Sequence, residues 1–249
     1  MNRETFKEAC GRIIDSCGKE PGIGTLSEKT IHAVLKQYLC PDRACQEQKV
    51  GGFIADIRLP DRIIEIQTRG FDKLRRKLDA FLPLCPVTIV YPVAHIKYLR
   101  WIDPLTGQIS APRKSPRQGT VYQIIPELYK IKSYLRDPNL GFKVVLIDLE
   151  EYRMLDGWSR DKKRGSTKCD RIPSGLYDEV DIDFQESWPA LLPDGLPDPF
   201  TSADYKKATR VSQGCAGTAL HILYYAGCLT RTGKKGNSYL YRRKDPYAV

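Results

Sequence analysis

Three short extended segments constrain the fold of this chain more than any other feature, and they occupy residues 46–50, 53–59 and 62–67. The turn-forming pairs Gly51–Gly52 and Pro60–Asp61 separate them. Short runs bounded by such pairs are typical of strands joined by tight hairpins. The pattern therefore predicts a three-stranded antiparallel meander.

Segments with helical periodicity lie on both sides of this meander. We expect helices over residues 2–17, 28–38 and 72–82, the last of them rich in Lys and Arg. Residues 87–93 and 143–149 are almost entirely apolar, as in strands that are buried on both faces. This order predicts an α/β sandwich, and the second apolar run extends its core to about residue 190.

The distribution of charge divides the chain. Its 249 residues carry 40 Lys and Arg against 30 Asp and Glu, a net charge of +10 that suggests a polyanionic partner but is equally compatible with a role in solubility alone. Residues 201–249 hold nine cations and two acids, whereas residues 170–200 hold eight acids and one Arg. We expect an acidic, Pro-rich linker over residues 178–199, with an α/β domain at residues 1–190 and a basic domain at residues 191–249.

The sequence disfavours two classes of protein. No apolar run is long enough to span a bilayer, and the first twenty residues are too polar for a signal peptide, so we expect a soluble, cytoplasmic protein without membrane contact. The eight cysteines form no CxxC pair, which disfavours a structural zinc site and indicates reduced thiols.

Two acids of the predicted meander are candidates for metal binding. Because side chains alternate along a strand, Asp56 and Glu65 can meet across the second hairpin, with Gln67 on the face of Glu65. Two carboxylates with an open side suit Mg²⁺ or Mn²⁺ and phosphodiester hydrolysis. Acids on the solvent face of a hairpin also occur without any function, and this alternative stays open.

This order of residues resembles the PD-(D/E)XK nuclease superfamily. The resemblance covers roughly residues 25–95, with Glu28 on a helix, Asp56 on one strand, Glu65-Ile66-Gln67 on the next, and then a basic helix and a buried strand. It implies an α/β, mixed-sheet sandwich of the restriction-endonuclease-like type. It also implies metal-dependent hydrolysis of DNA, with Asp56 and Glu65 binding the metal and Glu28 assisting.

The sequence departs from this superfamily at one position. Gln67 stands where Lys is most frequent, and an amide cannot supply the positive charge that orients and acidifies the attacking water. Some members resemble this sequence and take a Lys from the adjoining helix, for which Lys73 is the candidate and Arg69 the alternative. The exchange is equally compatible with a weakened or inactive site. The cations near this helix that could hold the scissile phosphate are Arg69, Lys73, Arg75, Arg76 and Lys77.

The carboxy-terminal segment carries a second pattern. Thr201 with Asp204 is typical of a capped helix, and a break at Val211–Ser212 leads into a second helix rich in small residues. A basic hairpin about a turn at residues 233–237 follows. Over residues 200–243, this order resembles a winged helix-turn-helix.

The winged-helix resemblance implies contact with duplex DNA. The second helix would lie in the major groove with five residues facing outward, namely Gln213, Gly214, Gly217, Thr218 and His221. Cations on the wing would contact phosphate, namely Arg231, Lys234 and Lys235. Winged helices also serve as protein-binding modules, but the local excess of cations favours DNA.

Together these patterns predict a metal-dependent DNA endonuclease that a winged helix docks on duplex DNA. A homodimer is expected if both strands are cut, because one site per chain cuts one strand. The alternative is a non-catalytic DNA-binding regulator with a degenerate nuclease fold, and a nuclease acting on RNA also stays open. The basic stretch at residues 158–171 is either a phosphate-binding loop or a solvated surface loop.

Overall fold

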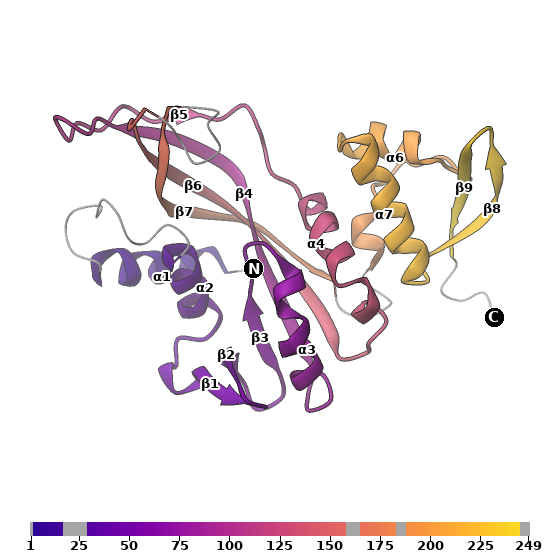
Figure 1. Ribbon diagram of the computed structural model, residues 1–249, viewed down its shortest axis with the longest axis horizontal. Helices are drawn as coiled ribbons and strands as arrows, with labels where there is room; N and C mark the ends of the chain where they lie inside the picture. Colours follow the sequence, from indigo (N-terminus) through magenta and orange to yellow (C-terminus); the bar gives the residue numbers. More distant parts are fainter. Residues whose placement is uncertain (1, 17–28, 158–164, 183–187, 245–249) are drawn as a thin grey trace. The chain divides into compact units, whose positions relative to one another are not determined.

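The structure is a computed structural model that describes residues 2–16, 29–157, 165–182 and 188–244 (Figure 1). It is a mixed α/β protein with a large mixed sheet, which confirms the α/β class, while the restriction-endonuclease-like type stays a prediction. The chain forms two compact units, each built from three stretches of sequence. Unit 1 comprises Met1–Gln48, Pro92–Thr120 and Val145–Glu179, and unit 2 comprises Lys49–Tyr91, Val121–Val144 and Val180–Val249. The domain boundary expected between residues 190 and 191 stays a prediction.

The large sheet contains the three predicted meander strands and both apolar runs. Its strands are β1 (Gln46–Val50), β2 (Phe53–Arg58), β3 (Ile63–Ile66), β4 (Val87–Ile102), β5 (Arg113–Lys114), β6 (Leu140–Met154) and β7 (Thr167–Ile182). The strand order is β1-β2-β3-β4-β6-β7, and β5 pairs with β4. The β2–β3 pair is antiparallel and the β3–β4 pair is parallel, so the sheet is mixed. The Gly51–Gly52 turn has positive φ at both residues, 53° and 82°, which glycine tolerates best.

A short helical segment follows β3 in unit 2. It begins as a 3-10 turn (Phe71–Leu74) and continues as α3 (Arg75–Phe81), which confirms the helix predicted at residues 72–82. Leu78 and Phe81 are both fully buried, and the Phe81 ring meets the Phe53 ring of β2 edge-on at 6.3 Å. The apolar face of α3 is therefore packed into the core of unit 2.

The carboxy-terminal elements also belong to unit 2. They are α6 (Ser202–Thr209), α7 (Gln213–Tyr225), β8 (Leu229–Lys235) and β9 (Ser238–Arg243). Thr201 and Asp204 form the predicted capping box, and Ser212 caps α7. The helix α7 packs against α4 (Ile125–Lys130) of the same unit. The predicted order of helix, turn, helix and hairpin is confirmed.

The segment expected to be a linker, residues 178–199, is structured over much of its described length, so that prediction was wrong in part. The strand β7 continues through Ile182, and Trp188 and Leu191 are buried in unit 2. The Trp188 ring lies 6.0 Å from the ring of Phe142. The high content of acids and prolines concealed these apolar residues, whose burial offsets the cost of ordering the chain.

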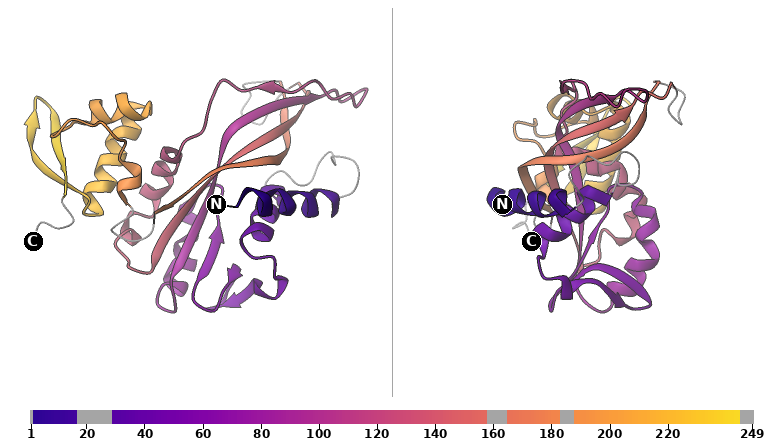
Figure 2. Two further views of the ribbon diagram at one scale, coloured as in Figure 1. Left: turned by 180° about the vertical axis from the view of Figure 1, so that it is seen from behind. Right: turned by 90° about the vertical axis from the view of Figure 1, so that its left-hand side faces the viewer.

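Unit 1 contains the helices α1 (Arg3–Ser16) and α2 (Lys29–Leu39), which pack against each other and appear in indigo in Figure 2. The predicted apolar stripe of α2 is confirmed by the burial of Ile31, Val34 and Leu35. Unit 1 also holds the later parts of β4 and β6 and most of β7.

The sequence predicts no membrane-spanning helix and reduced cysteines, and the structure bears on both only over residues 2–16, 29–157, 165–182 and 188–244. Within these ranges, no helix is long and apolar enough to cross a membrane. The seven cysteines in the same ranges are free. Of the stretch at residues 158–171, the part from Thr167 onward belongs to β7 rather than to a loop, and residues 158–164 lie outside the described residues.

Replacing Leu78 by Ala should test the packing of α3. Because Leu78 is fully buried, Leu78→Ala should lower the free energy of unfolding by about 2–5 kcal/mol in urea denaturation. The matched control is Leu84→Ala, which removes a side chain that is 61% exposed and should change stability by less than about 0.5 kcal/mol. Equal losses in the two variants would contradict this placement of the core.

Candidate functional site

The two candidate acids lie where β2 and β3 separate. Ile57 pairs with Ile64 in the antiparallel register, and one step further Asp56 stands opposite Glu65. At this position the side-chain carboxylates accept hydrogen bonds from main-chain N–H groups of the opposite strand. The Ile66 N–H donates to Asp56 Oδ2 at 2.8 Å, and the Asp56 N–H donates to Glu65 Oε1 at 3.2 Å. The structure thus brings the two acids together between the strands.

The environment of Glu65 opposes its negative charge. Its side chain belongs to a strand whose four residues are all buried, and Glu65 itself is 2% exposed. Burial and the nearby charge of Asp56 raise the pKa of Glu65, and the ammonium of Lys77 only partly offsets this. With both carboxylates ionised, the cluster of Asp56, Glu65 and Lys77 has a net charge of −1. One further cation would reduce the repulsion between the two acids.

The cation at this cluster is Lys77 rather than Lys73. Lys77 Nζ lies 2.6 Å from Glu65 Oε2 and belongs to α3, where it directly precedes the buried Leu78. Lys73 lies one turn earlier in the 3-10 segment and is exposed. Lys73 and Lys77 each directly precede a buried leucine, Leu74 and Leu78, so the sequence alone does not distinguish them.

Gln67 and Arg69 contribute to the loop after β3. The Gln67 amide donates to the main-chain oxygen of Arg69 at 2.5 Å and to that of Gly70 at 3.5 Å. Its amino group is therefore used to hold this loop. Arg69 is exposed on the loop. Glu28, the remaining predicted catalytic residue, lies outside the described residues.

The two acids fit a hard cation with incomplete protein coordination. Over the described ranges, no group of three or more His, Cys, Asp or Glu side chains is arranged to hold a metal ion. Asp56 and Glu65 would therefore supply two carboxylates, and water or a bound phosphate would supply the other ligands. Mg²⁺ favours such mixed coordination over a complete cage of protein ligands.

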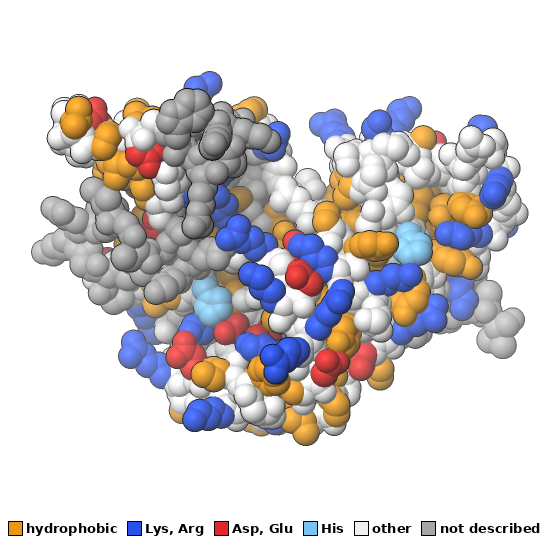
Figure 3. Space-filling model, in the orientation of Figure 1, with side chains coloured by type: hydrophobic (Ala, Val, Ile, Leu, Met, Phe, Trp, Pro, Cys, Tyr) orange, Lys and Arg blue, Asp and Glu red, His pale blue; other side chains and the backbone are white. Residues whose placement is uncertain are grey.

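Cations gather over α3 and α4 on the face shown in Figure 3. Arg75 donates through Nε to the main-chain oxygen of Lys130 at 3.1 Å, and the Arg76 guanidinium lies 5.8 Å from the centre of the Phe53 ring. Neither of these two contacts brings a negative charge to Arg75 or Arg76. Acidic side chains lie among the cations of this face, and Lys130 pairs with Glu127.

The predicted groove-facing residues of α7 lie in two different environments. Gln213 is exposed at the start of α7 and donates to Ser202 Oγ at 3.0 Å, while Thr218 is half-buried and donates to the Gly214 main-chain oxygen at 2.9 Å. His221 is half-buried and packs against the Tyr129 ring of α4 at 6.0 Å. Burial, together with Lys132 and Arg231, lowers the pKa of His221. His221 therefore faces α4 while the amino-terminal end of α7 is exposed.

The β8–β9 hairpin presents cations together with tyrosine rings. The Arg231 guanidinium lies 4.4 Å from the ring centre of Tyr224 and 4.0 Å from that of Tyr239. Lys234 Nζ lies 4.9 Å from the ring centre of Tyr239, and Lys235 is exposed. Both tyrosines are 41% exposed. Sequence reasoning missed both tyrosines. The alternation of Tyr239 and Tyr241 along β9 was the available signal for Tyr239, whereas Tyr224 lies in α7.

Comparison with known proteins places the chain in a family. Residues 29–183 match the family described as "Domain of unknown function (DUF8091)". The chain belongs to this family. The matched region contains Asp56, Glu65 and Lys77 and ends before α6.

One relative aligns with this chain over most of the length of both proteins. It is described as "Uncharacterized protein" from Treponema pallidum (strain Nichols) and is 30% identical over 231 residues, which cover 90% of this chain and 88% of the relative. No solved structure matches the chain.

Glu65 and Glu150 should affect stability with opposite dependence on pH. The pKa of Glu65 is raised, so the folded protein retains this proton to a higher pH than the unfolded chain. As pH rises above about 4.3, wild type should lose stability relative to Glu65→Gln. Burial opposes ionisation of Glu150, but Arg100 and Tyr152 outweigh it and lower its pKa. Below about pH 4.3, wild type should therefore lose stability relative to Glu150→Gln as pH falls.

Urea denaturation at a series of pH values, with a chelator present throughout, measures both effects. Each variant loses the hydrogen bonds of its glutamate at every pH. The change with pH in the difference in free energy of unfolding between variant and wild type therefore reports the titration of that glutamate. If the stability difference between variant and wild type changed with pH in the same direction for the two glutamates, the environment described for Glu65 would be contradicted.

Proposed function

We propose that the chain is a metal-dependent endonuclease with a restriction-endonuclease-like core, acting on duplex DNA. The observation that carries this proposal is the cluster of Asp56, Glu65 and Lys77, in which the half-buried Asp56 meets the buried Glu65 and the Lys77 ammonium contacts Glu65. The superfamily that the sequence resembles uses two acids and a Lys. Here α3 supplies the Lys that β3 lacks.

Each residue of the cluster has a distinct part in the proposal. Asp56 and Glu65 would hold Mg²⁺ or Mn²⁺, which supplies Lewis-acid activation of a bound water and neutralises charge on the phosphate. Lys77 would donate to the attacking water or to a non-bridging phosphate oxygen, where negative charge increases in the transition state. Gln67 would keep the loop after β3 in place. Arg69 would contact the DNA backbone.

The carboxy-terminal elements would dock the chain on DNA as a winged helix. The exposed start of α7 makes Gln213 the first candidate for groove contact. The half-buried Thr218 is a second candidate, and the contact of His221 with α4 leaves His221 a smaller part. Arg231, Lys234 and Lys235 on the hairpin would bind phosphate. Cutting both strands would require a homodimer, because each chain has one such cluster.

A non-catalytic DNA-binding regulator is the second candidate function. It is supported by Gln67, which stands in place of the expected Lys and turns its amide toward the loop. The same winged helix would dock this regulator on DNA. A cleavage assay separates the two candidates.

Plasmid cleavage with Mg²⁺ or Mn²⁺ should depend on Lys77. Replacing Lys77 by Ala removes a charge positioned for the transition state and should slow cleavage by about 100-fold or more. Lys73→Ala is the matched control, since Lys73 lies one turn away and is exposed. It should stay within about threefold of wild type, as expected for an exposed side chain outside the cluster.

Binding and cleavage must be separated in this assay. Asp56→Asn should abolish cleavage while retaining affinity for a duplex in a gel-shift measurement, because Asp56 contacts the metal in the proposal and not the docking surface. Duplex DNA and structured RNA should be compared as substrates. If wild type cleaves neither with either metal and still binds duplex DNA, the regulator is the correct function.

The hairpin cations should determine how binding depends on salt. Lys234→Gln and Lys235→Gln should each weaken duplex binding and lower the slope of log K against log[salt] by about 0.9, the value for one lost phosphate contact. Lys114→Gln, which removes an exposed cation of β5, should leave the slope unchanged. Slopes equal to that of wild type in both hairpin variants would place the DNA elsewhere.

A further inference from the structure

Unit 1 contains a network in which one buried acid contacts several partly exposed cations. Glu151 of β6 is fully buried. Its carboxylate oxygens lie close to four cationic groups from β4, β6 and β7, namely Arg153 at 2.6 Å, Arg171 at 3.2 Å, Lys97 at 3.3 Å and Lys168 at 3.8 Å. One carboxylate balances one of these charges, so the network has an excess of positive charge.

The pKa values of Glu151 and Lys168 reflect the positive charges of this network. Burial opposes ionisation of Glu151, but the charges of Lys97, Lys168 and Arg153 outweigh burial and lower its pKa to about 2. Burial and repulsion from Arg171 lower the pKa of Lys168. Four cations thus surround one carboxylate, and a second anion would be stabilised beside them.

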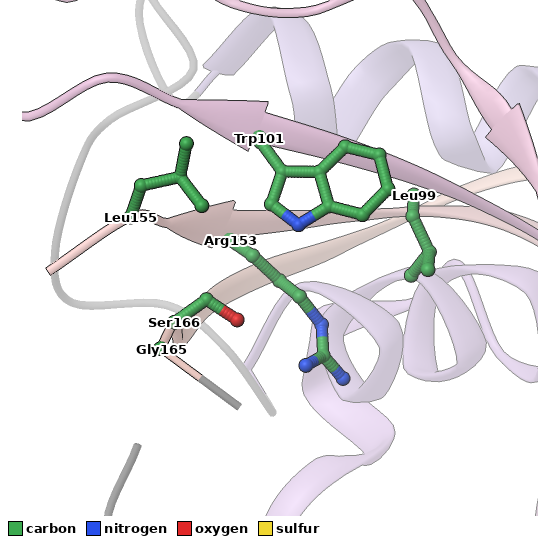
Figure 4. A pocket seen from close by; sticks show the side chains of 6 residues that line it. All are labelled: Leu99, Trp101, Arg153, Leu155, Gly165 and Ser166. Atoms are coloured by element: carbon green, nitrogen blue, oxygen red, sulfur yellow. The ribbon is translucent and has the colours of Figure 1, made fainter. Parts of the chain in front are cut away.

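A pocket of about 240 Å³ lies next to this network in unit 1. It is lined by Leu99, Trp101, Arg153, Leu155, Gly165 and Ser166 (Figure 4). Trp101 projects from β4 and Arg153 from β6, and Figure 4 shows the indole and the guanidinium extending into the same space. Arg153 therefore belongs both to the network and to the wall of the pocket.

The lining divides into an apolar part and an anion-binding part. The Trp101 indole with Leu99 and Leu155 offers a flat apolar surface on which a planar ring can stack. Arg153 and the Ser166 hydroxyl line the same pocket and supply hydrogen-bond donors of the kind that phosphate oxygens accept. A ligand that fits both parts has a planar ring and a phosphate group.

We propose that this pocket binds a nucleotide, with its base on Trp101 and its phosphate beside Arg153 and Ser166. The site uses residues of unit 1 alone, so the proposal does not depend on the function proposed for Asp56 and Glu65. The nucleotide can be free in solution or part of a single strand of nucleic acid. Both sources present the same base and phosphate.

Isothermal titration of the full chain with defined probes tests the proposal. The probes are adenosine and thymidine 5′-monophosphates, adenosine, inorganic phosphate and a single-stranded oligonucleotide. A monophosphate or the oligonucleotide should bind at least about tenfold more tightly than adenosine or phosphate, because it engages both parts of the site. Tighter binding of the oligonucleotide identifies a strand as the source, and tighter binding of a monophosphate identifies a free nucleotide.

Two variants and two controls assign the binding to this pocket. Trp101→Leu should weaken binding about tenfold through loss of stacking, and Lys168→Gln should weaken it through loss of charge without changing the pocket wall. Lys114→Gln removes an exposed cation of the same unit and should bind like wild type. Asp56→Asn should also bind like wild type, which separates this site from the proposed nuclease.

Three results would overturn the proposal. They are the absence of binding by every nucleotide probe, equal affinity for phosphate and for the monophosphates, and unchanged binding in both Trp101→Leu and Lys168→Gln. Thermal melting of each variant checks its folding. If Trp101→Leu does not fold, Lys168→Gln still decides the outcome, because Lys168 makes the longest of the four contacts with Glu151.

Discussion

The insertion of two carboxylates between β2 and β3 is the interaction on which the rest of the site depends. A buried Glu65 beside Asp56 is costly in free energy unless main-chain donors and a cation compensate it. The main-chain N–H groups of Asp56 and Ile66 provide the donors, and Lys77 provides the cation. The position of α3 is therefore tied to the acids, because the residue next to Lys77 is the fully buried Leu78.

The two compact units use opposite imbalances of charge. In unit 2, Asp56 meets Glu65 and one ammonium contacts Glu65, an arrangement that suits a metal cation. In unit 1, Glu151 is surrounded by four cationic side chains, which leaves room for an anion. The same physical principle applies to both, since a buried cluster with unequal charges gains stability from a ligand that balances it. A net charge of +10 over the chain would add a long-range attraction for polyanions.

Local rules predicted the elements whose patterns are simple. The meander strands, the capping box at Thr201 and the order of the carboxy-terminal elements followed from turn residues, caps and periodicity. The strand β7 escaped prediction because its residues are mostly polar and include Pro173, which an edge strand tolerates. The meeting of Asp56 and Glu65 followed from alternation along the strands. Whether Lys73 or Lys77 reaches Glu65 depends on how α3 is rotated about its own axis against the core. The local sequence does not determine this rotation.

Diffraction from crystals soaked in Mn²⁺ tests the central claim most directly, because the anomalous signal locates the ion independently of any activity. We predict a peak within about 2.0–2.3 Å of one carboxylate oxygen of Asp56 and one of Glu65, with water in the remaining positions. The peak should be absent from Asp56→Asn crystals treated in the same way. A wild-type map with no peak between these two acids, at an Mn²⁺ concentration that supports cleavage by known Mn²⁺-dependent nucleases, would contradict the account.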